Sequence, residues 1–376
     1  MSGDLDRLRL ARTTGVGPVT YRRLLARYGT ATAALEALPG LARSGGRATP
    51  PAIPTPGEAE AEFEAVGRGH GVLLFLGTPA YPPLLALLED APPVIALAGR
   101  LEVLERRTVG MVGSRNASTN GLYMAEHMAG DFAAAGLAVV SGLARGIDAA
   151  AHTGALRTGV TIACIAGGLD RPYPPQNVAL QARIAECGAV LTEAPPGTVA
   201  QARLFPRRNR LIAGLSLGVV VVEAALRSGS LITAEMAQEA GREVYAVPGS
   251  PLDPRARGTN DLIRQGARLA ETAAEVIADL PLSPAAGDAA GPLFRRPRLS
   301  EAQAPLATQE EAPDEAQVAA RLLELMSPAP TDIDALIRAA GLPAALVMGA
   351  LLSLEVAGRI ETLLGNKVAL LADPGH

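Results

Sequence analysis

A chain of 376 residues, 48% of them hydrophobic, is long enough for two or three domains with a large core. Cys164 and Cys187 lack metal-binding spacing, so we expect neither a disulfide framework nor a zinc site. No stretch has the order of a signal peptide or the length of a membrane span, which favours a cytoplasmic protein without a membrane contact.

The formal net charge of -4 is unevenly distributed along the chain. Residues 200–268 hold ten arginines and six acidic residues, whereas residues 314–376 hold four basic and eight acidic residues. The charge of a domain decides its attraction to a polyanion more than the total charge does. The central region is therefore compatible with nucleic-acid binding, and the carboxyl-terminal region does not favour it.

The first 70 residues predict a helical domain, with helices over residues 5–13, 20–28 and 32–38. The turn Gly15-Val16-Gly17-Pro18 is similar to that of a helix-hairpin-helix motif, in which glycine amides approach a DNA phosphate. A purely structural turn between two helices has the same pattern, so both interpretations stay open. Residues 45–57 are rich in proline and glycine and predict a loop.

From residue 72 onward, short apolar runs alternate with helical patterns. After two apolar runs at 72–75 and 94–97, strands are predicted over residues 108–112, 137–141, 160–165, 189–192, 217–223 and 243–247, with helices over 118–135, 147–157, 176–186, 208–215 and 231–240. Strands of nearly uninterrupted Val, Ile and Ala are typical of a parallel sheet buried on both faces. The alternation predicts a doubly wound α/β domain over residues 71–280.

Residues 281–313 are rich in proline and alanine and predict a linker. Residues 314–376 then predict three helices (315–326, 331–340 and 343–356) and a two-strand ribbon (358–361 and 367–370), which fits a small winged-helix module. Its candidate recognition helix, residues 344–352, carries no basic residue. Because phosphate contacts dominate DNA affinity, we expect this acidic module to pack against protein and not against DNA.

Ligands of a doubly wound sheet bind beyond the carboxyl ends of its strands. Every loop predicted at that edge is rich in glycine, and several carry arginine. Arginine side chains and free amides at helix N-termini are the usual protein groups that hold phosphate, so an anion site is predicted there. The candidate binding residues are Gly113, Ser114, Arg115, Gly142, Arg145, Gly146, Phe205, Arg207, Arg208, Asn209, Arg210, Ser228, Gly229 and Ser230.

The common phosphate-binding fingerprints are absent from the sequence. It contains neither the dinucleotide pattern GxGxxG nor the P-loop pattern GxxxxGK[ST]. The histidines show no metal spacing, and no serine or cysteine has an evident histidine partner, so no catalytic residue, metal or cofactor is predicted. Asp148 is expected to cap its helix or to pair with Arg145, and Glu223 to orient arginines.

Five segments taken together resemble the DprA/Smf family of DNA-processing proteins. They are Gly113-Ser114-Arg115 and the runs 141–148, 205–210, 223–234 and 258–267. The resemblance implies an extended Rossmann-like domain between a SAM-like, helix-hairpin-helix domain and a winged-helix domain. It also implies a non-catalytic protein that binds single-stranded DNA, protects incoming DNA, forms a homodimer through the Rossmann-like domain and loads RecA recombinase during natural transformation.

In that comparison, the arginines of residues 205–210 would line one pocket with Arg115. Phe205 would either stack on a base or lie in the core beside Pro206. One departure is Leu217, which stands where some relatives carry a lysine.

Two other functions compete with single-strand binding. A Rossmann-like phosphoribohydrolase would need a PGGxGTxxE run, and the comparable residues 228–235 lack its paired glycines and its Gly-Thr. A purely structural dimer module would leave the arginine cluster unexplained. The sequence does not indicate the dimer surface or the RecA contact surface.

Overall fold

The computed structural model describes residues 2–47, 49–281, 315–363 and 365–371. The chain divides into two compact units, Met1–Glu60 with Arg295–His376, and Ala61–Phe294. The amino-terminal helices and the carboxyl-terminal module thus share one unit, and the other unit begins ten residues before the predicted start of the Rossmann-like domain at residue 71. Nearly all of the predicted linker, residues 282–313, lies outside the described residues.

The described part of the second unit contains one nine-stranded sheet in the order β1-β2-β6-β5-β4-β3-β7-β8-β9. The seven strands β3 to β9 are parallel to one another. Strand β2 pairs with β6 in antiparallel fashion, and β1 pairs with β2 in the same way. Their bounds are β1 Gly71–Phe75, β2 Val94–Gly99, β3 Thr108–Val112, β4 Ala138–Ser141, β5 Thr161–Cys164, β6 Ala189–Thr192, β7 Gly218–Val221, β8 Glu243–Ala246 and β9 Arg268–Leu269.

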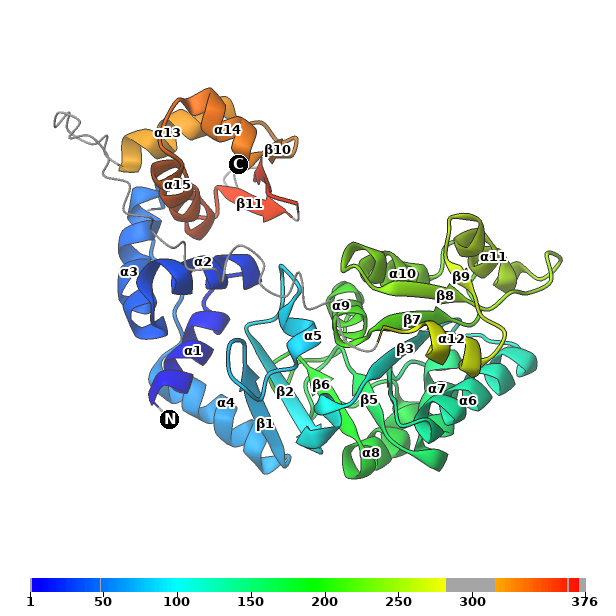
Figure 1. Ribbon diagram of the computed structural model, residues 1–376. Helices are drawn as coiled ribbons and strands as arrows, with labels where there is room; N and C mark the ends of the chain where they lie inside the picture. The colour runs from blue at the N-terminus through cyan, green and yellow to red at the C-terminus, as the bar shows by residue number, and fades with distance from the viewer. Residues whose placement is uncertain (1, 48, 282–314, 364, 372–376) are drawn as a thin grey trace. The chain divides into compact units, whose positions relative to one another are not determined.

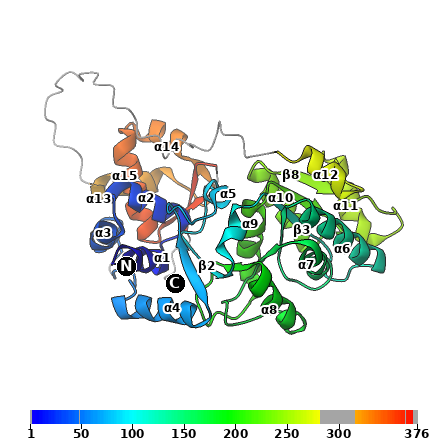
Figure 2. The ribbon, with the colours of Figure 1, turned by 60° about the horizontal axis from the view of Figure 1, so that its bottom comes forward.

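Helices cover both faces of this sheet (Figures 1 and 2). Alternate residues of the strands explain why, since Val219 and Val221 join the core under α9 and α10, whereas Val220 and Val222 join the core under α6, α7 and α12. The helices are α4 Pro56–Arg68, α5 Pro83–Ala86, α6 Thr119–Ala134, α7 Ile147–Thr158, α8 Val178–Cys187, α9 Phe205–Leu215, α10 Gly229–Glu239, α11 Arg257–Arg264 and α12 Ala273–Asp279. Short 3₁₀ turns are Leu101–Glu105, Pro175–Asn177, Ala202–Leu204 and Pro254–Ala256.

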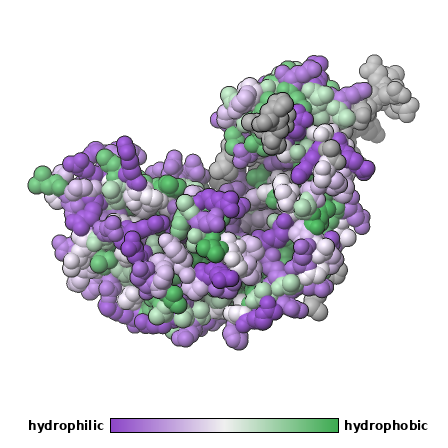
Figure 3. All heavy atoms as spheres, turned by 180° about the vertical axis from the view of Figure 1, so that it is seen from behind, coloured by the Kyte–Doolittle hydropathy of each residue, from purple (hydrophilic) through white to green (hydrophobic). Residues whose placement is uncertain are grey.

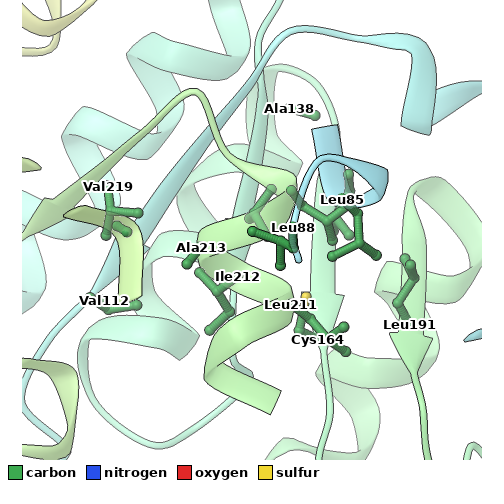
Figure 4. Close-up of a cluster of buried hydrophobic side chains, with 14 of the residues drawn as sticks. Leu85, Leu88, Val112, Ala138, Cys164, Leu191, Leu211, Ile212, Ala213 and Val219 are labelled. Carbon is green, nitrogen blue, oxygen red and sulfur yellow. The ribbon is translucent and has the colours of Figure 1, made fainter. Parts of the chain in front are cut away.

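Helix α9 is anchored by its apolar side. Figure 4 shows Leu211, Ile212 and Ala213 of α9 beside Leu85 and Leu88, in the core that also holds residues of the central strands. This burial fixes the position of the first turn of α9, where the arginines predicted to bind an anion begin. The helix starts at Phe205, three residues before the predicted start, because Pro206 is favourable in a first turn.

The prediction of a doubly wound sheet is confirmed. The strand order reverses at β3, which pairs with β4 on one side and β7 on the other. Such a reversal separates neighbouring loops and opens a crevice at the carboxyl ends of the strands.

The first unit contains an amino-terminal helical domain and a carboxyl-terminal winged-helix module. The first has α1 Ser2–Arg12, α2 Pro18–Tyr28 and α3 Ala31–Ser44, and the second has α13 Glu315–Leu325, β10 Thr331–Asp332, α14 Ile333–Ala340, α15 Ala344–Val356, β11 Ile360–Leu363 and β12 Lys367–Leu370. Strand β10 was not predicted, and it completes a three-stranded sheet in the order β10-β12-β11. The expected winged-helix architecture is confirmed.

Among the described residues, no single helix combines the length and apolar composition that a membrane crossing needs. Helices α14 and α15 would meet both measures only as a pair, and the chain bends by 116° between them. On the face drawn in Figure 3, apolar side chains are scattered among polar ones.

Candidate nucleic-acid interface

A pocket of about 310 Å³ lies beyond the carboxyl ends of β3, β4 and β5. It is lined by three strand-end loops, by the proline-rich segment before α8, and by the first turn of α9. This is the edge where the sequence predicts an anion site. Of the predicted residues, those that line it are Arg115, Gly142, Arg145, Phe205 and Arg208.

Four guanidinium groups face this pocket. Arg115, Arg145 and Arg171 are exposed, and Arg208 is buried. Arg171 pairs with Asp170 at 3.5 Å, and Arg208 lies 3.7 Å from Asp148. Within the described parts of the chain, Arg115 and Arg145 have no carboxylate at ion-pair distance. The rim of the pocket therefore carries positive charge that protein groups leave uncompensated.

The buried Arg208 forms the floor of the pocket and is held by Asp148 in the first turn of α7. The carboxylate Oδ2 of Asp148 also accepts a hydrogen bond from the amide of Ala144, 3.2 Å away. Burial raises the pKa of Asp148 and lowers the pKa of Arg208, and each charge opposes the effect on the other. Asp148 thus ties the loop 142–146 to α9, and its partner is Arg208 and not the expected Arg145.

Gly142 is required by the position of Arg208. A Cβ atom on Gly142 would lie 1.3 Å from Nη1 of Arg208, so any larger residue would expel the guanidinium. Gly146 has a comparable constraint, because its φ is +76° and an added Cβ would lie 2.2 Å from the carbonyl oxygen of Ser114. The loops that follow β3 and β4 are consequently packed against each other, with the Ile147 amide donating to Ser114 at 3.1 Å.

Phe205 lines the pocket and is half-buried, so it is not a core aromatic. The guanidinium of Arg115 lies 4.9 Å from its ring centre, and that of Arg208 lies 5.7 Å from it. The ring of Tyr173 lies 6.0 Å away in a tilted arrangement. Cations near an aromatic face are attracted by its quadrupole, so Phe205 and the two arginines support one another's positions.

The remaining charged residues of α9 point elsewhere, because successive helical residues are rotated by about 100°. Arg210 is nearly buried and pairs with Glu193 and with Asp90, the latter at 2.7 Å. Burial lowers the pKa of Arg210, but these two carboxylates outweigh that effect and raise it. Arg207 is exposed and also pairs with Glu193, at 3.2 Å. The expectation that all three arginines line one pocket is therefore met by Arg208 alone.

The other predicted residues surround the switch point of the sheet. The Ser114 hydroxyl accepts from the Asn116 amide at 3.1 Å, and Ser228 caps α10 with its hydroxyl 2.7 Å from that of Ser230. The side chain of Asn209 donates to the carbonyl of Gly229 at 3.4 Å, which joins α9 to α10. None of Ser228, Gly229 and Ser230 is among the residues that line the pocket.

Glu223 holds the amino end of α6 and does not orient the pocket arginines. Its carboxylate accepts from the amide of Ser118 at 2.9 Å and from the hydroxyl of the same residue. A Cβ on Gly121, in the first turn of α6, would meet this carboxylate at 2.5 Å. Glu223 is thus a structural cap that positions the helix following the Gly113-Ser114-Arg115 loop.

Comparison with known proteins settles the family. The family model described as DNA recombination-mediator protein A matches residues 72–281 of this chain. The chain belongs to the DprA/Smf family. Models of the DprA-like N-terminal helix-hairpin-helix domain and of the DprA winged helix domain match residues 2–65 and 304–366.

This DprA/Smf protein is similar to proteins from several bacteria. It is 38% identical to the protein Smf of Escherichia coli over 77% of this chain and 75% of the relative, and 43% identical to the DNA processing protein DprA of Bacillus subtilis over 54% and 68%. Among solved structures, DprA from Streptococcus pneumoniae aligns with a TM-score of 0.62 at 35% identity over 75% of this chain and 99% of that one. DprA from Helicobacter pylori, whose study describes a single-stranded DNA binding mode, aligns with a TM-score of 0.51 at 28% identity over 56% and 97%.

Two pocket residues of this DprA/Smf protein were missed by the sequence analysis. Arg171 and Tyr173 lie in the segment Asp170-Arg171-Pro172-Tyr173-Pro174-Pro175, which connects β5 to α8. A cation and an aromatic residue interleaved with prolines in a strand-end loop is the signal that could have identified them.

The interior beneath the pocket contains a neutral histidine. His152 is fully buried, and burial followed by the charge of Arg208 lowers its pKa to about 3. Its Nδ1 lies 2.7 Å from the Thr161 hydroxyl, which itself donates to the carbonyl of Val139, so Nδ1 carries the proton. Among the described residues, no group of three or more His, Cys, Asp or Glu side chains could hold a metal ion.

Proposed function

We propose that this DprA/Smf protein binds single-stranded DNA at the pocket beyond β3, β4 and β5, without catalysing a reaction on it. The observation that carries the proposal is the combination of two unpaired arginines, Arg115 and Arg145, with the accessible ring of Phe205 in one pocket. Uncompensated guanidiniums attract the backbone, and an aromatic ring offers a stacking surface to a base.

The geometry favours a single strand over a duplex. A base can reach Phe205 and Tyr173 inside a pocket of about 310 Å³ only when it is unpaired and turned away from its neighbours. Backbone contacts and stacking do not depend on which base is present, so binding is tolerant of sequence. The single-stranded DNA binding mode described for the Helicobacter pylori relative agrees with this proposal.

The pocket also lacks the chemistry expected of a phosphoribohydrolase. Asp148 is engaged with Arg208 and the Ala144 amide, and Glu223 caps α6, so neither carboxylate is placed to act on a substrate in the pocket. His152 is buried and neutral. These three engaged groups support a binding function and not a hydrolytic one.

Membership of the DprA/Smf family extends the proposal to partners. We infer that the protein delivers its bound strand to RecA recombinase in the cytoplasm during transformation and recombination, and that it dimerises through the Rossmann-like domain. The edge strand β9 supports a dimer contact, because Leu269 on it is half exposed and, among the described residues, no strand pairs with its outer side. Light scattering of the full chain tests this, and a monomer at micromolar concentration would contradict it.

The binding site is tested by titrating single- and double-stranded oligonucleotides at several salt concentrations. In the variant Arg115→Ala with Arg145→Ala, we expect weaker single-strand binding and a salt slope reduced by about 1 or more, because two phosphate contacts are lost. The matched control is Arg106→Ala, an exposed arginine before β3 at the opposite edge of the sheet. Wild-type affinity in the double variant would refute the site, and release of a nucleobase from a nucleoside monophosphate would favour the hydrolase.

A further inference from the structure

Helix α15 belongs to two hydrophobic cores at once. One side of it, with Val347, Ala350, Leu351 and Leu354, packs into the core of the winged-helix module. Leu352 and Val356, four residues apart and therefore on one helix face, pack instead into the core of the amino-terminal helices. Their exposures are 3% and 1%, so this second face is fully covered. The third helix of the module is thus enclosed over its carboxyl-terminal half.

The polar contacts of this face are also satisfied by the amino-terminal domain. Arg23 on α2 lies 3.4 Å from the carboxylate of Glu355 and 3.1 Å from the Thr362 hydroxyl, and the side chains of the ion pair are mostly buried. Arg47 donates to the carbonyl of Val356 at 3.5 Å, where the end of α15 leaves its carbonyl groups without helical partners. The contact between α15 and the amino-terminal domain therefore includes an ion pair and a hydrogen bond to the carboxyl end of α15.

The backbones come close at Gly45, which follows α3. A Cβ atom there would lie 2.1 Å from the carbonyl oxygen of Ser353 and 2.6 Å from the Cβ of Ala357. The backbones of α3 and α15 can approach this closely only because residue 45 has no side chain. The φ of Gly45 is -77°, so glycine is not needed there for backbone conformation.

The same contact includes the Gly15-Val16-Gly17 turn, which the sequence leaves open as a DNA contact. Val16 is buried in the core that holds Leu352 and Val356. The amide of Val16 donates to Thr13, and the amide of Thr14 donates to Ala52. The amide of Val16 in the turn and that of Thr14 just before it are thus already used within the domain, and the apolar residue of the turn faces protein.

We propose that the winged-helix module uses α15 to dock on the amino-terminal helical domain of its own chain, so that the partner of this helix is protein and not DNA. The docked helix lacks basic residues along its whole length. A helix that reads a major groove needs free residues facing the bases and cations facing phosphate. Helix α15 instead has its second face filled by Leu10, Tyr21, Leu24 and Leu38 of the amino-terminal domain and by their neighbours. This inference is independent of the pocket proposed to bind DNA.

Hydrogen–deuterium exchange of the full chain tests the docking with two glycine substitutions, one directly after α3 and one within it. In Gly45→Ala the new methyl group must displace the backbone of α15, and we expect exchange over residues 350–357 to rise by about tenfold or more. The control is Gly40→Ala within α3, where an added Cβ meets nothing within 4 Å. Wild-type exchange of residues 350–357 in Gly45→Ala would overturn the proposal.

A charge exchange separates loss of docking from loss of folding. Arg23→Glu places two carboxylates together and is expected to raise exchange over residues 350–357, and Glu355→Arg in the same chain is expected to restore protection. Failure of the double variant to restore protection would contradict the docking.

A third measurement adds single- or double-stranded oligonucleotides to the wild-type chain. Exchange over residues 344–356 should not change, and protection there by DNA would show that α15 reads nucleic acid.

Discussion

At the scale of single residues, the pocket depends on which side chains are left without partners. Arg115 and Arg145 keep free charge, whereas Arg207 and Arg210 share Glu193. The three arginines of residues 205–210 therefore have different surroundings, although they belong to one short segment. The arginine that is buried, Arg208, shapes the site, and the exposed arginines on other loops are the ones available to a ligand.

Phe205 offers a direct test of base stacking. Replacement of Phe205 by Leu keeps apolar volume but removes the aromatic face, and single-strand affinity should fall about tenfold to a hundredfold, given roughly 1–3 kcal/mol per stacked base. Fluorescence anisotropy with a labelled oligonucleotide measures the change. Tyr123→Leu is the control, because Tyr123 is an exposed aromatic residue on α6 that does not line the pocket. Equal losses in both variants would argue against stacking at Phe205.

At the scale of elements, the site is formed where the β4–α7 loop contacts the first turn of α9. Asp148, Ala144 and Arg208 connect these two segments, and Gly142 leaves the space that Arg208 occupies. A buried ion pair of this kind is costly to break by removing one partner, because the other charge is left in the interior.

Gly142→Ala tests this contact. The methyl group would displace the guanidinium of Arg208, so we expect the free energy of unfolding to fall by roughly 1–3 kcal/mol and single-strand affinity to fall with it. Urea denaturation and oligonucleotide titration measure the two effects. Gly67→Ala, on α4 of the same unit with nothing within 4 Å of the added Cβ, should retain wild-type affinity and be no less stable than wild type. Wild-type stability of Gly142→Ala would disprove the steric argument.

The central parallel sheet and its helices could be predicted from the sequence to within a few residues, because each buried strand is an apolar run bounded by turn residues. Strand β9 and helices α11 and α12 were not predicted, since each of them is too short for a clear periodic pattern. Strand β10 has two residues, and its position depends on pairing with β12. Local pattern does not indicate pairing between distant segments.

The site was predicted at the correct edge of the sheet, but the roles of its residues were not. Glycine and arginine in strand-end loops indicate the edge, because those loops must converge there. The partners of a charge depend on tertiary contacts, as Asp148 with Arg208 and Glu223 with Ser118 show. The sequence pattern therefore indicates which residues lie near the site. Only the packing of the folded chain shows which of them face a ligand and which hold the structure together.

At the scale of the whole molecule, the buried His152 couples stability to pH. Burial lowers the pKa of His152 from the ordinary 6.5 to about 3. Between pH 6.5 and pH 3, the histidine is therefore protonated in the unfolded chain and neutral in the folded chain. This histidine therefore costs stability in acid, by about 1.4 kcal/mol per pH unit within that window. Above pH 6.5 it is neutral in both states and contributes no pH dependence.

The variant His152→Gln isolates this effect. Glutamine leaves the Thr161 hydroxyl with a polar neighbour but does not titrate, so the variant should be less stable than wild type at pH 7 and the difference should shrink as pH falls below 6.5. Urea denaturation between pH 7 and pH 4 gives both curves. Parallel curves for the two proteins would show that His152 is not the coupled group.

The division of the chain into units has a consequence for its synthesis. The first unit is assembled from the two ends of the chain, with the entire second unit between them. A ribosome releases the amino-terminal helices first, yet Leu352 and Val356, which complete their core, emerge hundreds of residues later. The Rossmann-like domain can therefore fold during translation. Until residues 352–356 have been made, the apolar face of the amino-terminal helices that they cover stays exposed to solvent. Full-length synthesis becomes a condition for closing the first unit, so a truncated chain would expose that face to chaperones and proteases.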